Sequence, residues 1–489
     1  MRNYTIKCLL GLSLAATLAG CGGSGNSTDN NQLPPTSAAT PITAVGQITG
    51  FGSVYVNGVE YDTTGASYDV DDAAASGDDA LGVGMVVQIQ GAVNADGLTG
   101  QATSIAYDDD VEGIVENLAT DVDDANVKTF TVMGISIRAD KNSTNFEGED
   151  DPTFSFDNIM NGDNVEVSGD FSGDILIASY IEKQDASDDE FEAKGTVDQY
   201  NGSDQFALIL RNGSTLNVTI DGGAEIPSSG VMDGQYVEVE GTIPDPANAP
   251  DSILATKVEL EDYDRISDGD EDDVEIKGVL SYDMDTGTWS VLDVRLSFDE
   301  NTEYSPEDLA GQIDDLSADG LYVEVEGQYV NEVLQVHEIE LEEDDLEFKA
   351  DVESVTSTDA RTGTVTLSFG SATGTVEVIV TPDTKFLDDE AMVHYDLTSI
   401  MAGDKVEIEA RIADDGMYYA SSLNAEDDDG YEIEGPLDAI DDVSITVLGV
   451  TFTVDMDTVF EDGMPSVGNY VEVEDDDSDG TADSVEIED

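Results

Sequence analysis

The stretch Gly234-Gln-Tyr-Val-Glu-Val-Glu-Gly241 decides the fold of this 489-residue chain, because the chain contains six versions of it. The versions begin at Gly84, Gly162, Gly234, Gly320, Gly403 and Gly468. Their first glycines lie 78, 72, 86, 83 and 65 residues apart in chain order. Apolar and polar residues alternate in each version, as in a β-strand with one buried face. Six versions at this spacing predict a chain of repeated β-domains.

Further signals surround each of these glycine strands. Most are followed by Ala or Val, two residues and an aliphatic residue, as in Ala178-Ser-Tyr-Ile181. A hairpin signal precedes several of them, with Asn57-Gly58, Asn212-Gly213 or Leu448-Gly449 at its turn. Short helical turns are expected between hairpin and glycine strand, as at 156–160 and 396–401. One unit therefore reads strand, two-stranded hairpin, short helix, strand, strand, which is the order of an OB-type barrel.

We therefore expect an all-β protein, a tandem array of about six small five-stranded OB-like barrels with a short helix each. An open sandwich is the alternative. Acidic joints such as Asp108-Asp109-Asp110 separate the units and favour an extended array, because like charges repel. The expected β-repeats are 44–107, 111–184, 191–262, 274–345, 346–427 and 430–489.

The glycine strands and the Ala-x-x-aliphatic strands resemble those of bacterial lipoproteins made of tandem small OB-like β-barrel domains of unknown function. The resemblance covers residues 44–489 and is weakest in the fifth repeat, where Ala350 replaces a glycine. It implies no activity and no catalytic residues.

The N-terminus has the order of a bacterial lipoprotein signal peptide over residues 1–20. Arg2 and Lys7 flank an apolar stretch that is too short to span a bilayer. Leu18-Ala-Gly-Cys21 resembles a lipobox, which implies lipidation at Cys21 and a membrane anchor. The alternative is an ordinary secreted protein whose mature chain begins with cysteine. Gly22 follows the cysteine where, in that family, an aspartate would favour retention at the inner membrane, so the resemblance implies the outer membrane, facing the periplasm or the cell exterior. Residues 22–43 are expected to form a flexible tether.

The charge is strongly acidic, with 17 basic and 110 acidic residues. Such a surface repels phosphate backbones, so we expect no nucleic-acid partner. It favours cations, an unknown basic partner in the envelope or outside the cell, or solubility at high salt. Of the two cysteines, Cys8 leaves with the signal and Cys21 is lipidated, so no disulfide or thiolate metal site is expected.

The C-terminal stretch Asp475 to Glu486 carries the sharpest ligand signal. Its acidic residues at loop positions 1, 3, 5, 9 and 12, with glycine at 6, fit a calcium loop. These residues are Asp475, Asp477, Asp479, Asp483 and Glu486. The alternative is a hairpin turn at Asp479-Gly480, since the flanks read as strands.

No other motif predicts chemistry. His337 and His394 lack a second histidine or a cysteine nearby, and Trp289 is expected in the core of the fourth repeat. Glu238 and Glu240, like Glu324 and Glu326, are expected to face water, and the alternative is a ladder of carboxylates that collects cations. We expect a non-enzymatic structural or binding array that requires no cofactor, with calcium as an optional ligand. The alternative is an enzyme or small-molecule binder with a site in one divergent repeat.

Overall fold

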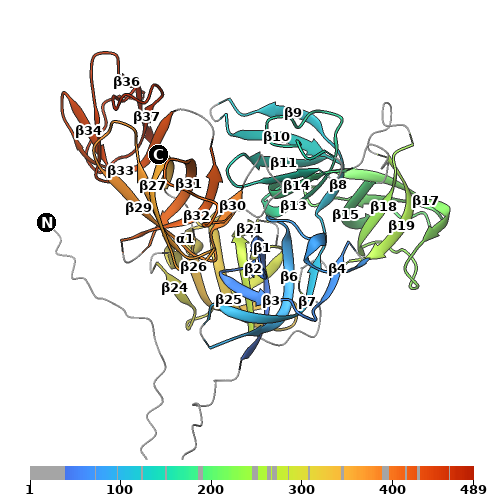
Figure 1. Ribbon diagram of the computed structural model, residues 1–489. Coiled ribbons are helices and arrows are strands. Elements are labelled where there is room, and N and C mark those ends of the chain that lie inside the picture. The colour runs from blue at the N-terminus through green and yellow to red at the C-terminus, as the bar shows by residue number, and fades with distance from the viewer. Residues whose placement is uncertain are drawn as a thin grey trace, which may run out of the picture. The chain divides into compact units, whose positions relative to one another are not determined.

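The computed structural model describes residues 39–488, with gaps at 72, 96, 123–124, 149–150, 185–190, 245–251, 262–265, 267–272, 285, 307–308, 343–345, 388–395, 414–415, 427–429 and 462. The described chain is almost entirely β-structure and repeats one strand order (Figure 1). The prediction of an all-β protein built from repeated domains is therefore confirmed.

The first three repeats contain nineteen strands and one 3-10 turn. Repeat 1 comprises β1 (Thr40–Phe51), β2 (Val54–Val56), β3 (Val59–Asp62), β4 (Ser67–Val70), β5 (Ala73–Ala75), η1 (Asp78–Ala80), β6 (Val86–Val93) and β7 (Thr99–Tyr107). Repeat 2 comprises β8 (Val111–Ile114), β9 (Glu116–Thr120), β10 (Val127–Val132), β11 (Ile135–Asp140), β12 (Asn145–Gly148), β13 (Asn164–Ser172) and β14 (Ile175–Lys183). Repeat 3 comprises β15 (Phe191–Asp198), β16 (Gln205–Ile209), β17 (Thr215–Glu225), β18 (Tyr236–Thr242) and β19 (Ser252–Leu260).

The last three repeats contain the remaining strands and one α-helix. Repeat 4 comprises β20 (Asp273–Val279), β21 (Ser281–Asp283), β22 (Thr288–Val291), β23 (Val294–Ser297), β24 (Glu303–Ser305), α1 (Leu309–Asp315), β25 (Tyr322–Tyr329) and β26 (Leu334–Leu341). Repeat 5 comprises β27 (Leu346–Ser357), β28 (Gly363–Ser368), β29 (Thr375–Val380), β30 (Lys385–Leu387), β31 (Lys405–Ile412) and β32 (Tyr418–Ala425). Repeat 6 comprises β33 (Tyr431–Ile440), β34 (Ser444–Val447), β35 (Val450–Thr453), β36 (Val459–Phe460), β37 (Tyr470–Asp475) and β38 (Ser484–Glu488).

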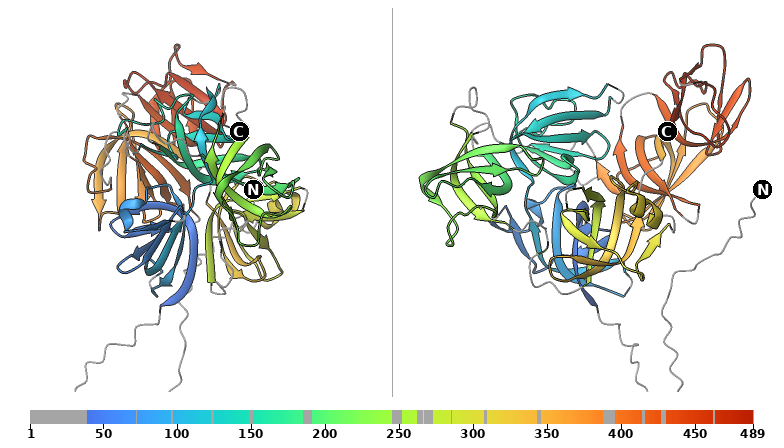
Figure 2. Two further views of the ribbon diagram at one scale, coloured as in Figure 1. Left: turned by 90° about the vertical axis from the view of Figure 1, so that its right-hand side faces the viewer. Right: turned by 180° about the vertical axis from the view of Figure 1, so that it is seen from behind.

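The strands of repeat 3 form a closed hydrogen-bonded circuit. It runs from β15 through β16, β17, β19 and β18 back to β15, and within it the pair β17–β19 is parallel. Repeat 5 has the same circuit through β27, β28, β29, β32 and β31. Within repeat 1 the strands curve round a common core, as the blue ribbon in Figure 2 shows.

The two glycines of the glycine strand have different physical roles. All six opening glycines have φ between 87° and 99°, where a side chain would strain the turn before the strand. The closing glycine lies at a bulge, and a Cβ at Gly169 would meet the carbonyl oxygen of Ile177 at 2.1 Å. Gly91, Gly241 and Gly327 meet a carbonyl oxygen in the same way at 2.2–2.4 Å. Close approach of two strands therefore explains the closing glycine.

The tight hairpins occur where they were predicted. Asn57 and Gly58 have φ of 50° and 73° between β2 and β3, and Leu448 and Gly449 have 48° and 81° between β34 and β35. The Asn212-Gly213 signal falls in a wider loop, because β16 ends at Ile209 and β17 begins at Thr215.

The expectation of a short helix in each repeat is wrong. Among the described residues, repeat 4 has α1 and repeat 1 has the 3-10 turn η1. The segments 156–160 and 396–401 form single turns, such as that closed by Ile159 N donating to Ser155 O at 3.1 Å. A single turn fixes several dihedral angles for few hydrogen bonds, so it does not propagate into a helix on its own.

In four repeats a threonine that follows the hairpin is hydrogen-bonded to the backbone at the last strand, a contact that no pattern in the sequence indicated. Its hydroxyl donates at 2.7–3.0 Å to a carbonyl oxygen that lies in the last strand in three repeats and just before it, at Ala482, in repeat 6. The pairs are Thr144 with Ala178, Thr302 with Val336, Thr384 with Ala420, and Thr458 with Ala482. The acceptors are the small or branched residues that open the Ala-x-x-aliphatic pattern.

The repeats are joined, which corrects the expected extended array of separate units. First strands pair across repeats in β8–β15, β27–β33 and the parallel pair β1–β20. The buried side chains of repeats 2 and 3 form one continuous cluster, as do those of repeats 5 and 6. Buried apolar surface thus outweighs the repulsion between the acidic joints. In addition, β1 begins at Thr40, inside the predicted tether, because residues 40–47 pair with β6.

None of the helices in the described part of the chain is long and apolar enough to cross a membrane.

Candidate functional site

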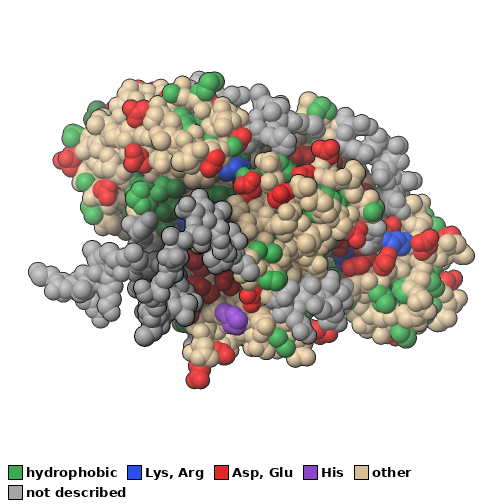
Figure 3. All heavy atoms as spheres, turned by 60° about the horizontal axis from the view of Figure 1, so that its bottom comes forward, with side chains coloured by type: hydrophobic (Ala, Val, Ile, Leu, Met, Phe, Trp, Pro, Cys, Tyr) green, Lys and Arg blue, Asp and Glu red, His purple; other side chains and the backbone are tan. Residues whose placement is uncertain are grey.

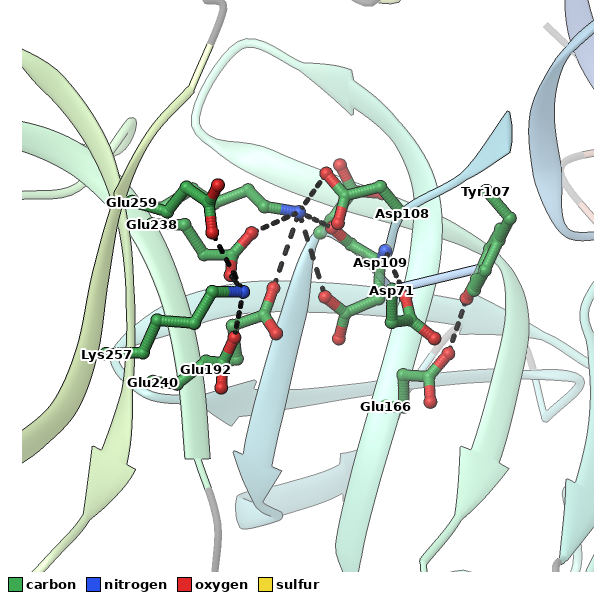
Figure 4. Close-up of polar contacts among 12 residues, drawn as sticks. Asp71, Tyr107, Asp108, Asp109, Glu166, Glu192, Glu238, Glu240, Lys257 and Glu259 are labelled. Carbon is green, nitrogen blue, oxygen red and sulfur yellow. Dashed lines mark hydrogen bonds and ion pairs between the residues drawn. The ribbon is translucent and has the colours of Figure 1, made fainter. Parts of the chain in front are cut away.

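Carboxylates from repeats 1 and 3 and from the connection between repeats 1 and 2 converge at one place, which we call the acidic junction. It consists of Asp71, Asp108, Asp109, Glu192, Lys194 and Glu238 (Figure 4). Asp71 follows β4, and Asp108 and Asp109 connect β7 to β8. Glu192 and Lys194 lie on β15, where Lys194 is the cross-strand partner of Glu238 on β18. Because β8 pairs with β15, the connection from repeat 1 is brought onto the outer face of repeat 3.

Lys194 is the cation at the centre of the junction. Its Nζ lies 2.5 Å from Asp108 Oδ2, 3.4 Å from Glu192 Oε1 and 3.8 Å from Glu238 Oε2. It also lies 3.8 Å from Asp109 Oδ1 and donates to the backbone carbonyl oxygen of Asp109. One ammonium group is therefore shared by four carboxylates.

Asp109 is the most poorly compensated of these carboxylates. Its side chain is 3% exposed, and neither oxygen accepts a hydrogen bond from an N–H or hydroxyl group of a described residue, although the Glu192 carboxyl group lies within hydrogen-bonding reach. Burial raises the pKa of Asp109 well above its usual value, and the charge of Glu192 raises it further. Burial likewise raises the pKa of Glu238 to about 10. Both groups have lost the water that normally stabilises a carboxylate, so each favours a proton or an additional cation.

A second lysine extends the junction along β18 and β19. Lys257 Nζ lies 2.5 Å from Glu240 Oε1, 3.1 Å from Glu259 Oε2 and 3.6 Å from Glu238 Oε1. On the other side, Tyr107 Oη donates to Glu166 Oε1 at 2.6 Å (Figure 4). The ion-pair network therefore continues through Glu238 to Lys257, and the Tyr107–Glu166 pair lies beside it (Figure 4).

The expectation that the strand glutamates face water is wrong for Glu238, which is 2% exposed. Strand pairing between repeats 2 and 3 covers this outer face. Glu240 and Glu324 are half-buried, and Glu326 is exposed. Elsewhere acidic side chains are spread over the surface, as on the face shown in Figure 3.

The predicted calcium loop brings together three of its five residues. Carboxylate oxygens of Asp475, Asp477 and Asp483 lie within 4.8 Å of one another. Asp475 is fully buried and accepts hydrogen bonds from Asp479 N at 3.0 Å and Gly480 N at 2.8 Å. The Asp479 carboxylate instead accepts from Thr481 N at 2.8 Å, and Glu486 lies in β38 opposite Glu472. The three-residue cluster has the oxygen ligands that calcium prefers, held by a loop of eight residues rather than by a two-residue hairpin.

The remaining predicted residues fall in three places. Cys21 and His394 lie outside the described residues. His337 is exposed on β26. Trp289 on β22 is 7% exposed and packs on Tyr282 with ring centroids 4.9 Å apart, which confirms its core position in repeat 4.

A cavity of about 200 Å³ among repeats 1, 2, 4 and 5 was not predicted. Lys277, Lys385 and Arg411 line it. Lys277 Nζ lies 3.0 Å from Glu342 Oε2 and also contacts Asp383. Lys385 Nζ donates to the carbonyl oxygen of Ser179 at 3.3 Å, and burial lowers the pKa of Lys385 to about 8. The residues that line the cavity come from four repeats, so no local pattern in the sequence could have predicted it.

A repeated signal for the acidic junction was present but missed. The first strands of repeats 3, 4 and 5 carry Glu-x-Lys before a small residue, as in Glu192-Ala-Lys194-Gly195. The others are Glu275-Ile-Lys277-Gly278 and Glu347-Phe-Lys349-Ala350. Three of only 17 basic residues recur at one strand position. This recurrence indicates that the face on which they lie is covered rather than exposed to solvent.

The repeats correspond to a known sequence family. A domain of unknown function (DUF5666) matches residues 41–106, 112–182, 277–340, 352–423 and 434–488. The chain belongs to this family. Residues 191–260 are not matched, although repeat 3 has the same strand circuit as repeat 5.

Other comparisons add little. No curated protein matches the chain. A solved chain titled "drosophila Unr CSD456" is similar over 48% of this chain and 96% of its own length, at 15% identity and a TM-score of 0.11.

Proposed function

We propose that this protein is a lipid-anchored, non-enzymatic, strongly acidic component of the bacterial cell envelope, whose repeats act as a structural or binding array. One observation carries the proposal: first strands pair across repeats in β8–β15, β27–β33 and β1–β20. Such pairing turns repeated domains into a connected scaffold, which suits spacing or the display of a surface.

The finer architecture belongs to the same proposal. We assign about six OB-like barrels, supported by the closed circuits of repeats 3 and 5 and by the parallel pairing of the third and last strands. The net charge of −93 favours a basic envelope or extracellular partner and disfavours nucleic acid. Calcium at Asp475, Asp477 and Asp483 is compatible with this array and is not required for it.

The anchor is assigned to Cys21, preceded by Leu18-Ala-Gly20, and the outer membrane is favoured by Gly22. The test is metabolic labelling with a radioactive fatty acid in a bacterial host, followed by membrane fractionation. Wild type and Cys8→Ala should be labelled and remain with membranes, because Cys8 lies in the signal peptide. Cys21→Ala should be unlabelled; label retained on this variant would contradict the anchor.

A second candidate function is a small-molecule binder, and the cavity at Lys277, Lys385 and Arg411 favours it. The test is a thermal-shift screen of small polar metabolites on the full chain and on Ser421→Phe, which places a large ring in the cavity wall. A compound that raises the melting temperature of wild type alone would support a binder. Equal shifts in both proteins for every compound would count against it.

A further inference from the structure

We propose that the acidic junction binds one divalent cation through oxygens of Asp71, Asp108 and Asp109, beside the Lys194 ammonium group. The inference rests on the proposed acidic array and gives it a specific ligand. These three residues supply carboxylate oxygens that lie within 4.8 Å of one another. Two come from the connection between repeats 1 and 2, and the third follows β4 of repeat 1.

The observation that points to a ligand is the state of Asp109. A carboxylate that is 3% exposed normally accepts hydrogen bonds from donors around it, yet neither oxygen of Asp109 accepts one from an N–H or hydroxyl group of the described residues. The carboxyl group of Glu192 lies within hydrogen-bonding reach, but two carboxylates can share a hydrogen bond only when one of them is protonated. Its contact with Lys194 is a long one, 3.8 Å. A cation at this position would supply the positive charge and the oxygen contacts that N–H and hydroxyl donors of the protein do not provide to Asp109.

Charge at the junction leads to the same conclusion. Lys194 is in contact with Asp108, Asp109, Glu192 and Glu238, and Asp71 lies next to them because the Asp109 N–H donates to Asp71 Oδ1 at 3.4 Å. Glu238 also contacts Lys257, which Glu240 and Glu259 share, so seven carboxylates face two ammonium groups, an excess of five negative charges if all are ionised. One divalent ion removes two of these charges at once, whereas each proton neutralises one.

The ligand chemistry favours calcium. The available atoms are hard carboxylate oxygens, without the imidazole or thiolate that zinc prefers. The three aspartates come from two connections rather than from one rigid element, and calcium tolerates irregular oxygen geometry better than magnesium does. Partial exposure of Asp108, whose side chain is 42% exposed, leaves a route for the ion and its remaining waters.

The test is isothermal titration of the chelator-treated full chain with calcium chloride in 0.15 M sodium chloride. Asp109→Asn removes the poorly compensated carboxylate, and Asp108→Asn removes an exposed one with less risk to folding, which circular dichroism checks. Asp442→Asn is the matched control, because Asp442 is an exposed acidic residue far along the chain. Asp477→Asn separates the C-terminal loop.

We expect wild type, Asp442→Asn and Asp477→Asn to share a saturable calcium site. Asp109→Asn and Asp108→Asn should bind at that site at least about tenfold more weakly. Unchanged affinity and stoichiometry in a folded Asp108→Asn variant, or only unsaturable binding to wild type, would overturn the proposal. Either result would leave labelling of Cys21 unaffected, so failure of this site is distinguishable from failure of the anchor.

Discussion

The acidic junction and the C-terminal loop are both clusters of carboxylates, but they are stabilised in different ways. In the loop, Asp475 accepts two backbone N–H groups, Asp479 accepts one from Thr481, and Asp483 accepts one from Asp476. At the junction, Asp109 is buried without any such donor and depends on Lys194. Acidic residues are denser along the sequence in the loop. At the junction, however, a buried carboxylate lacks the backbone donors that stabilise those of the loop. Hydrogen-bond satisfaction, rather than local acidity, therefore identifies the place that needs a cation.

Replacing Lys194, whose ammonium group lies at the centre of the acidic junction, should have the largest effect on stability. Lys194→Met leaves the buried Asp109 and Glu238 and the partly buried Glu192 around an apolar side chain, while Asp108 keeps access to water. The free energy of unfolding should therefore fall by about 3–5 kcal/mol. Urea denaturation of the full chain at pH 7.5 measures it. Arg138→Gln is the control, because the Arg138 side chain is 41% exposed and lies 3.6 Å from Asp140. A control loss equal to that of Lys194→Met would remove the contrast between buried and exposed pairs.

The junction should also make stability fall as the pH rises. Burial raises the pKa of Glu238 to about 10 in the folded state, so the folded chain holds a proton that the unfolded chain has already released. Stability from this group is complete below the ordinary carboxyl pKa and is lost as the pH rises toward 10, at no more than about 1.4 kcal/mol per pH unit.

Urea midpoints of the full chain between pH 6 and 8 test this dependence. Glu238→Gln should flatten the decline, whereas Asp442→Asn should not. Parallel pH profiles for wild type and Glu238→Gln would show that Glu238 does not titrate with a raised pKa.

A substitution in the C-terminal loop should have a smaller effect on stability, because it removes one backbone hydrogen bond and leaves the others in place. Asp475→Asn keeps one acceptor oxygen and leaves the N–H of Asp479 or Gly480 facing an amide group, so the free energy of unfolding should fall by about 1–2 kcal/mol. Thermal melting in the presence of a chelator measures this loss without any calcium contribution. Asp457→Asn is the control: Asp457 is exposed, and its own N–H donates to Asp455. An unchanged melting temperature for Asp475→Asn would mean that the loop does not depend on this carboxylate.

The parts of the fold that could be predicted are those that depend on residues close together in the chain. The opening glycines require a positive φ, and all six have one. The Asn57-Gly58 and Leu448-Gly449 hairpins form because two adjacent residues adopt positive φ. The helices were overestimated, since apolar spacing over four or five residues cannot distinguish one turn from a helix.

The candidate site could not be predicted in the same way. Asp108-Asp109-Asp110 was interpreted as a repelling joint, because the sequence gives no indication that Lys194 comes to lie 2.5 Å from Asp108. Glu238 was expected to face water, because alternation distinguishes two faces of a strand but not solvent from a neighbouring repeat. The recurring Glu-x-Lys pairs were the one local signal for a covered polar face.

The sequence by itself determined that this protein is a chain of repeated β-domains. Alternation, turn glycines and spacing act over a few residues and are repeated six times. The tertiary structure alone decided which repeats share a core, which outer faces are covered, and where carboxylates are left without donors. Those outcomes depend on β8 meeting β15, β1 meeting β20 and β27 meeting β33. Such pairings are chosen by the fit of whole surfaces, and the free energy of that fit is not encoded in any short stretch of the chain.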